Sequence, residues 1–172
     1  MDVLEAIKTR RSVRRFDRGR AVEDEKIEVS LNAARWAPSA NNSQPWEFIV
    51  VKGERTRKKL ASLHAWGKFM SESPAVICVV ADPKRSPNYY HGDAAVATQN
   101  LLLSAWAQGL GTCWMGVLDT EFEAPVKKLL KVPECRRIVC LVAMGYPKEA
   151  PRSTRRALSS ITHIEVYGRK KA

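Results

Sequence analysis

Two short apolar runs and one long apolar helix between them constrain the fold of this chain more than any other feature. The runs 75–81 and 137–144 are rich in β-branched residues and too short for buried helices, so each predicts a buried strand. Residues 93–108 have helical length and apolar side chains on nearly every face, with Asp93 as the expected N-cap and Gly109 as the C-terminal cap. Such a helix is buried in a core or at an oligomer interface.

Weaker patterns complete the order of elements. Further helices are expected at 2–9, 23–36, 55–64 and 125–131, and further strands at 46–52 and 111–117. Asp2 followed by Glu5 predicts a capping box at the chain's first helix. The order predicts an α+β domain with α/β-type layers, in which helices flank one central mixed sheet. We expect a single domain over 1–172, with 148–172 as a C-terminal extension that packs on something larger than its own domain.

Composition excludes several classes of protein. No segment has the roughly 20 apolar residues of a membrane helix, and no signal peptide is evident, so cytoplasmic residence is the default expectation. The four cysteines fit no metal or redox spacing and are interpreted as buried thiols. The net charge of +11 suits nucleic-acid binding, but no recognition helix, aromatic RNA-binding pattern or zinc finger accompanies it. The classical dinucleotide fold is disfavoured because no G-x-G-x-x-G motif and no P-loop lysine are present.

Arginines cluster near both ends of the chain. Arg10, Arg11, Arg14 and Arg15 surround Ser12, and Arg152, Arg155 and Arg156 lie in the tail. The two clusters could converge on one anionic group or could be solvated surface. Guanidinium groups bind phosphate through paired hydrogen bonds, so a serine among four arginines favours an anion site.

A polar, turn-rich stretch runs from Pro38 to Trp46 between an apolar-periodic helix and a strand. Loops that connect core elements commonly carry a binding surface. Asparagine and glutamine supply hydrogen-bond donors and acceptors together, which suits a flat ligand with mixed edges. Trp46 itself is expected to pack in the core.

Four motifs in this order resemble the nitroreductase family, the FMN-dependent NAD(P)H oxidoreductases. They are Arg10-Arg-Ser-Val-Arg-Arg-Phe16, then Pro38-Ser-Ala-Asn-Asn-Ser-Gln-Pro-Trp46, then 93–114 with its Gly109-Leu-Gly-Thr-Cys-Trp114 ending, and Met144-Gly-Tyr-Pro147 before a basic tail. The resemblance covers nearly the whole chain. It implies a nitroreductase-like fold, an intertwined homodimer and two FMN sites at the dimer interface.

The resemblance also implies roles for individual residues. Arg10, Ser12 and Arg14, joined by Arg11, match the family's phosphate and ribityl contacts, and Arg155 or the adjacent Arg156 matches a basic residue that closes on the phosphate. Gln44 matches a residue near the flavin ring edge, and Trp114, Met115 and Gly116 match the segment near flavin N5. Many relatives have an acidic residue where Gly116 stands, which leaves a backbone role here. The positions that match contacts to the flavin of the opposite subunit are Pro38, Ser39, Ala40 and Asn42.

No catalytic protein side chain and no metal site is expected, because flavin N5 carries the chemistry in this family. The three histidines are interpreted as structural or surface residues. A region that is variable in the family and often shapes the substrate entrance corresponds to His64, Trp66, Lys68, Phe69 and Tyr89.

The function implied is ping-pong hydride transfer from NADH or NADPH through FMN to a small acceptor such as a nitroaromatic, a quinone or a flavin. Three alternatives stay open. The chain could belong to a branch with specialised flavin chemistry (flavin destruction, dehalogenation or deazaflavin maturation), could bind FMN without turnover, or could be a basic nucleic-acid-binding module.

Overall fold

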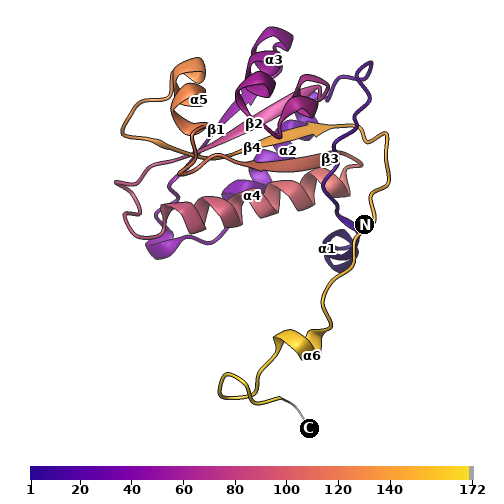
Figure 1. The fold of residues 1–172 in the computed structure, drawn as a ribbon, viewed down its shortest axis with the longest axis vertical. Coiled ribbons are helices and arrows are strands. Elements are labelled where there is room, and N and C mark those ends of the chain that lie inside the picture. The colour runs from indigo at the N-terminus through magenta and orange to yellow at the C-terminus, as the bar shows by residue number, and fades with distance from the viewer. Residues whose placement is uncertain (171–172) are drawn as a thin grey trace.

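The computed structural model describes residues 1–170, and the chain alternates helices and strands (Figure 1). The strands are β1 (Trp46–Val51), β2 (Ala75–Ala81), β3 (Gly111–Gly116) and β4 (Arg137–Gly145). The helices are α1 (Val3–Thr9), α2 (Asp24–Arg35), α3 (Glu54–Leu63), α4 (Tyr90–Ala107), α5 (Glu123–Leu130) and α6 (Leu158–Ile161). Short 3-10 turns occupy Ala40–Asn42 and Lys68–Ser71. The expected α+β class is confirmed.

The four strands form one sheet in the order β1-β2-β4-β3, and all three neighbouring pairs are antiparallel. A mixed sheet was expected from the helices between strands. The segments that contain α3 and α5 instead bring the chain back to the same end of the sheet, so the next strand runs in the opposite direction. The end of β1 therefore pairs with the start of β2 at Val51 and Val76, and Gly116 pairs with Cys140. Within residues 1–170 the one parallel pairing is an isolated bridge between Ser12 and Thr112.

Helices cover both faces of the sheet (Figure 1). On one face, α2 and α4 pack on alternate sheet residues that include Ile77, Val79 and Val142. On the other face, α3 and α5 pack on the intervening residues, which include Cys78 and Leu141. Successive side chains of a strand point to opposite faces, so a central strand covered on both faces is apolar throughout. That explains why every residue of β2 is buried.

Helix α4 begins earlier than expected, and its N-cap is Tyr89 rather than Asp93. The carboxylate of Asp93 is buried in the first turn and bonds two loops instead of capping its own helix. Gly109 follows the helix with φ +79°, as expected of a C-terminal glycine. One side of α4 is buried, but Val96 on the other side is 43% exposed.

At the N-terminus, Asp2 accepts a hydrogen bond from the backbone N–H of Glu5 at 2.9 Å, which confirms the predicted cap. Trp46 is buried, as expected. Within residues 1–170 no helix combines the length and the hydropathy needed to cross a membrane.

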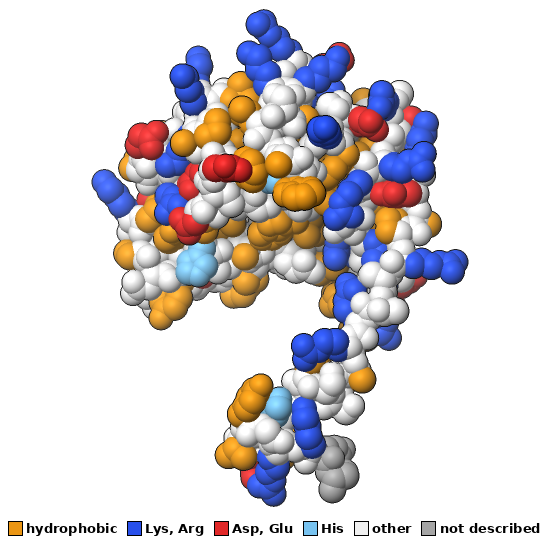
Figure 2. Space-filling model, in the orientation of Figure 1, with side chains coloured by type: hydrophobic (Ala, Val, Ile, Leu, Met, Phe, Trp, Pro, Cys, Tyr) orange, Lys and Arg blue, Asp and Glu red, His pale blue; other side chains and the backbone are white. Residues whose placement is uncertain are grey.

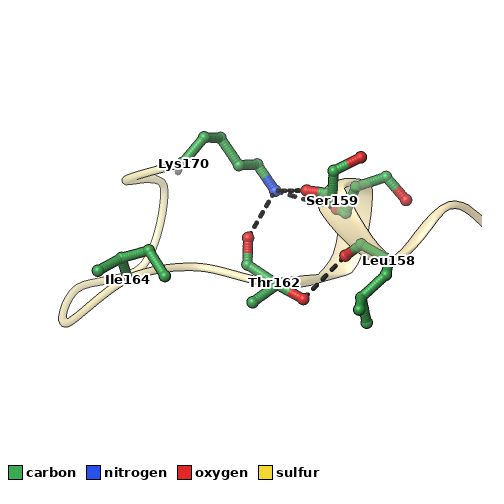
Figure 3. Close-up of a pocket in the computed structure, with 6 residues that line it drawn as sticks. Leu158, Ser159, Thr162, Ile164 and Lys170 are labelled. Atoms are coloured by element: carbon green, nitrogen blue, oxygen red, sulfur yellow. Dashed lines mark hydrogen bonds between the residues drawn. The ribbon is translucent and has the colours of Figure 1, made fainter. Parts of the chain in front are cut away.

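After β4 the chain leaves the body and extends away from it (Figure 1). The tail folds on itself around α6, where the Lys170 ammonium donates to the carbonyl oxygens of Ser159, Ser160 and Thr162 (Figure 3). Apolar side chains of the tail stand exposed: Leu158, Ile161, Ile164, Val166 and Tyr167. Exposed apolar side chains in such number are typical of a surface that packs on a partner.

Candidate functional site

The arginine-rich segment is fixed along the sheet by its backbone. The N–H of Val13 donates to the carbonyl of Thr112 at 2.9 Å, and the N–H of Asp17 donates to that of Tyr146 at 2.9 Å. Gly111 permits this close approach, since a Cβ there would stand 2.8 Å from the Cβ of Val13. The segment therefore holds its side chains at one defined end of β3.

The two arginine clusters converge. A cavity of about 250 Å³ is lined from the N-terminal segment by Arg10, Arg11, Ser12 and Arg14, and from the tail by Pro151, Arg152, Ser153 and Arg155. Arg156 is exposed and does not line this cavity. Five arginines thus line one space from two segments that lie about 140 residues apart in the sequence. We call this cavity the arginine cradle.

The cradle carries positive charge that the described residues do not neutralise. None of its lining residues is acidic, and within residues 1–170 no carboxylate forms a salt bridge with Arg10, Arg11, Arg14 or Arg155. Burial, and then the charges of Arg155 and Arg11, lower the pKa of Arg10. An anion in the cradle would relieve this repulsion.

The hydrogen-bond donors of Arg11 are only partly paired. One terminal nitrogen donates to the carbonyls of Lys8 and Arg10 at 2.7 and 2.8 Å, which closes the end of α1. The Nε of Arg11 is buried and has no hydrogen-bond partner within the described chain. Buried donors are nearly always paired, so an unpaired one beside a cavity indicates a missing acceptor.

The loop 38–44 is held in a tight, unusual conformation. Asn41, Asn42 and Gln44 all have positive φ, between 47° and 54°. The Ser39 hydroxyl accepts from the backbone N–H of Gln44 at 3.0 Å, and the Gln44 amide donates to the Asn42 side chain at 3.0 Å. Left-handed backbone in residues other than glycine persists only where the surroundings hold it, and it concentrates at binding sites.

The side chain of Asp93, in α4, stabilises this loop conformation through hydrogen bonds. Its carboxylate accepts from the backbone N–H of Ala40 at 3.1 Å, from the Ser43 hydroxyl at 3.4 Å and from the Ser86 hydroxyl at 2.7 Å. The loop 38–44 therefore sits at the N-terminal end of α4. The arginine cradle sits toward the other end, where the Trp106 indole N–H donates to the Thr9 hydroxyl at 2.9 Å.

The loop and the cradle are consequently far apart within one chain. Thirteen residues separate Asp93 from Trp106, which corresponds to about 20 Å along the helix axis. One small ligand held in the cradle cannot also touch the loop of the same chain unless it spans the whole helix.

The outer edge of β3 connects the cradle to a second group of expected residues. The carbonyls of Thr112 and Gly116 both face away from β4, since they accept from the Val13 N–H and the His64 imidazole. Backbone groups of an antiparallel strand alternate sides, so the N–H and C=O of Trp114 face the same free edge. The side chains differ, because Met115 is buried in the core while Trp114 is partly exposed.

The residues expected at the substrate entrance divide into two groups. Trp66, Lys68 and Tyr89 are exposed, with Trp66 and Tyr89 at 80% and 60%. His64 is buried and bonds Gly116 at 3.0 Å, and Phe69 packs with its ring 6.5 Å from that of Phe16. His64 is therefore closed to solvent, and Phe69 is partly buried.

Sequence reasoning missed several residues that shape the site. Asp93 was expected to cap a helix. Its hydrogen bonds to other loops could not be predicted, because no pattern among its neighbours in the sequence indicates them. The carboxylate of Glu149 accepts from the backbone N–H groups of Arg14 and Arg15 at 2.5 and 3.1 Å, which ties the tail to the arginine segment. The Asn100 amide of α4 donates to the carbonyl of Ala33 in α2 at 3.2 Å.

The metal-ligating residue types, the cysteines, the cavity of the tail and the surface charge of the described residues were also considered as possible sites. In residues 1–170 no cluster of metal-ligating side chains exists, and Cys78, Cys113 and Cys140 are buried free thiols while Cys135 is exposed. A cavity of about 520 Å³ lies within the tail's own fold, away from the cradle (Figure 3). Figure 2 shows Lys and Arg scattered over the visible face rather than along one stripe, which disfavours a nucleic-acid interface.

Comparison with known proteins gives one consistent result. The model of the Nitroreductase family matches residues 7–68 and 61–146. A relative from Methanothermobacter thermautotrophicus, provisionally named NADH dehydrogenase/NAD(P)H nitroreductase, is 38% identical over 88% of this chain and 80% of its own.

Solved structures agree. A crystal structure of a protein provisionally named NADH dehydrogenase/NAD(P)H nitroreductase from Parabacteroides distasonis is 31% identical, with a TM-score of 0.92 over 96% of this chain and 98% of its own. A protein from Desulfovibrio desulfuricans, described provisionally as a nitroreductase in complex with FMN, is 32% identical, with a TM-score of 0.87 over 97% and 98%.

Proposed function

Because the chain belongs to the nitroreductase family, we propose that it is an FMN-dependent oxidoreductase that uses NAD(P)H to reduce a small acceptor. The observation that carries the proposal is the arginine cradle, in which both ends of the chain place unpaired cations around one cavity. A relative of the same fold is described as a complex with FMN, and another is named as acting with NAD(P)H.

The residues of the cradle fit the phosphate of FMN. That group carries about two negative charges and several acceptor oxygens. Arg10, Arg14 and Arg155 supply charge, Arg11 supplies a buried donor without a partner, and the Ser12 hydroxyl supplies a neutral one. Hydrogen bonds from a guanidinium to a phosphate are charge-assisted, and such bonds are shorter and stronger than those between neutral groups.

FMN bound here would supply the redox chemistry, namely hydride transfer from the nicotinamide and then reduction of a second substrate in a ping-pong sequence. The protein has to bind and orient the group. The free edge of β3 suits this role, since the backbone N–H of Trp114 lies on the open side beyond the cradle. No side chain is required to move a proton, and no nucleophile with an adjacent base occurs at the site.

We further propose that the site is completed by a second copy of the chain. The loop 38–44 and the cradle lie toward opposite ends of α4, at the residues Asp93 and Trp106, which are about 20 Å apart along the helix axis. In a two-fold dimer with antiparallel α4 helices, the loop of one subunit would approach the cradle of the other. The exposed apolar side chains of α1, of α4 and of the tail agree with such an interface; they are Val3, Leu4, Ile7, Val96, Leu158 and Ile161. The tail 148–172 would then wrap the partner subunit.

The first experiment is flavin binding. The purified protein should be yellow or should take up added FMN, and NADH or NADPH should bleach it anaerobically. Arg10→Ala with Arg14→Ala should abolish tight binding. A matched pair, Arg55→Ala with Lys128→Ala, removes two exposed cations from α3 and α5 and should leave binding intact. A protein that takes up no FMN, or a double cradle variant with unchanged affinity, contradicts the proposal.

Anaerobic bleaching by NADH or NADPH also distinguishes a reductase from a protein that binds FMN without turnover. A protein that binds FMN but is not reduced by either nucleotide lacks the proposed NAD(P)H reductase activity, which leaves FMN binding without turnover or a branch with specialised flavin chemistry. Reoxidation with nitroaromatics, quinones and free flavin then defines the acceptor class.

A further inference from the structure

His64 uses both nitrogens of its imidazole to join two parts of the molecule. Its Nε2 lies 3.0 Å from the carbonyl oxygen of Gly116, and the backbone N–H of Trp66 donates to its Nδ1 at 3.3 Å. Because Nδ1 accepts, the proton must reside on Nε2, which donates to the Gly116 carbonyl. The geometry therefore selects one neutral tautomer of the ring.

The ring is held firmly in this position. His64 is 5% exposed, and its ring stacks on Phe122 with the centroids 4.3 Å apart. The chain after it folds closely around it, since a Cβ at Gly67 would stand 2.9 Å from the Cβ of His64 and would also collide with Met70. The two hydrogen bonds are thus made by a ring with little freedom to turn.

The two partners of the ring have different surroundings. Gly116 ends β3 on its free edge, two residues beyond Trp114. Trp66 is 80% exposed, although a large aromatic side chain usually avoids such exposure. A buried imidazole with both nitrogens engaged therefore fixes the backbone of Trp66, which carries an exposed indole, relative to the end of the edge strand.

We propose that His64 is a positioning residue that sets Trp66 beside the end of β3 as a stacking surface for a planar, aromatic electron acceptor. This inference rests on the proposed flavin site along β3 and names the class of acceptor it would serve. An indole offers a large flat face, and aromatic rings prefer offset stacking on such a surface. The acceptor would lie over Trp66 while the backbone of Gly116 borders the reacting group.

The alternative is that His64 is only a core residue. Three substitutions separate the two roles. His64→Phe keeps the stack on Phe122 and loses both hydrogen bonds, His64→Asn keeps an acceptor near the Nδ1 position, and His64→Gln keeps a donor near the Nε2 position.

The first readout needs neither flavin nor activity. Residue-resolved amide exchange of the protein should show faster exchange at Trp66 in His64→Phe and near-normal exchange in His64→Asn. The ¹⁵N spectrum of wild-type His64 should show the Nε2–H tautomer. Equal exchange at Trp66 in all four proteins, or the other tautomer, overturns the proposal whatever the flavin does.

The second readout is steady-state kinetics of the FMN-loaded protein with a quinone acceptor. In His64→Phe and in Trp66→Ala the KM for the quinone should rise about fivefold, as expected for the loss of one stacking or hydrogen-bonding contact. Trp66→Phe should recover most of the loss, and FMN affinity should change little. An unchanged KM for the quinone in Trp66→Ala overturns the proposal. If the wild-type protein binds no FMN, the proposed function is wrong, and the amide-exchange result alone then tests the role of His64.

Discussion

The carboxylate of Asp93 accepts a hydrogen bond from the backbone N–H of Ala40 at 3.1 Å. The same carboxylate bonds Ser86 and Ser43, so a single buried side chain holds the loop 38–44 against α4. The loop's left-handed residues store strain that this contact offsets.

Asp93→Ala should therefore loosen the loop and expose unpaired donors. We expect a loss of stability of about 1–3 kcal/mol, because buried groups lose their acceptor. FMN affinity should fall about tenfold if the loop contacts the flavin. Denaturant unfolding and FMN fluorescence titration measure the two effects. Thr98→Ser, a conservative change on the buried side of the same helix, is the control, and an unaffected FMN affinity in Asp93→Ala would argue against a flavin-facing loop.

Arg155 and Arg156 offer a matched pair of neighbouring arginines. Arg155 lines the cradle and lowers the pKa of Arg10, whereas Arg156 is exposed and does not line it. Arg155→Ala should weaken FMN binding at least about tenfold, as expected for a lost hydrogen bond between charged groups. Arg156→Ala should change the dissociation constant by no more than about twofold. Equal effects from both, measured by titration at low salt, would place the tail in a different register.

Val96 lies on the open side of α4 and is 43% exposed. Val96→Glu should prevent a dimer that buries this face, because an unpaired carboxylate is costly to bury. Light scattering should show a dimer for the wild type and a monomer for the variant. Ala124→Glu, on the exposed side of α5, should remain dimeric. A dimeric Val96→Glu protein would place the interface elsewhere.

Glu123 predicts a pH dependence of stability. Burial opposes its charge, but hydrogen bonds from Arg137 at 2.8 Å and from the Ile138 N–H at 3.0 Å prevail and lower its pKa below the usual 4.5. A carboxyl group with a lowered folded-state pKa contributes stability above its unfolded pKa and loses it as the pH falls through the folded pKa. Glu123→Gln should thus cost about 3 kcal/mol at pH 7. The difference from wild type should shrink below about pH 4.5. A difference that stays constant down to pH 3 would contradict this account.

Local patterns in the sequence predicted most elements well. The strand at 75–81 and the N-cap at Asp2 were correct, and the predicted helices and other strands ended within about three residues of their observed bounds. These features depend on neighbours in the chain: burial on both faces, or a side chain that reaches three residues along.

Features that depend on distant contacts were not predictable. The strand directions follow from where α3 and α5 return the chain, and the role of Asp93 follows from two loops 7 and 53 residues away. The arginine segments could be identified, but their convergence on one cavity required the fold. His64 was expected to shape a substrate entrance, and its burial and its bonds to Gly116 and Trp66 depend on contacts that the sequence does not display.

Mixed dimers test whether each flavin site takes its cradle from one subunit and its loop from the other, as proposed above. Subunits carrying Arg10→Ala and Arg14→Ala are co-expressed with subunits carrying Asp93→Ala, each with a different affinity tag, and the heterodimer is purified. The homodimer with both arginine substitutions should not bind FMN tightly, and the Asp93→Ala homodimer should bind it about tenfold more weakly than the wild type. If the site forms between subunits, the heterodimer has one site with both parts intact and binds one FMN per dimer with wild-type affinity. If each subunit forms its own site, both sites are damaged, and a heterodimer without any tight FMN site would contradict the account.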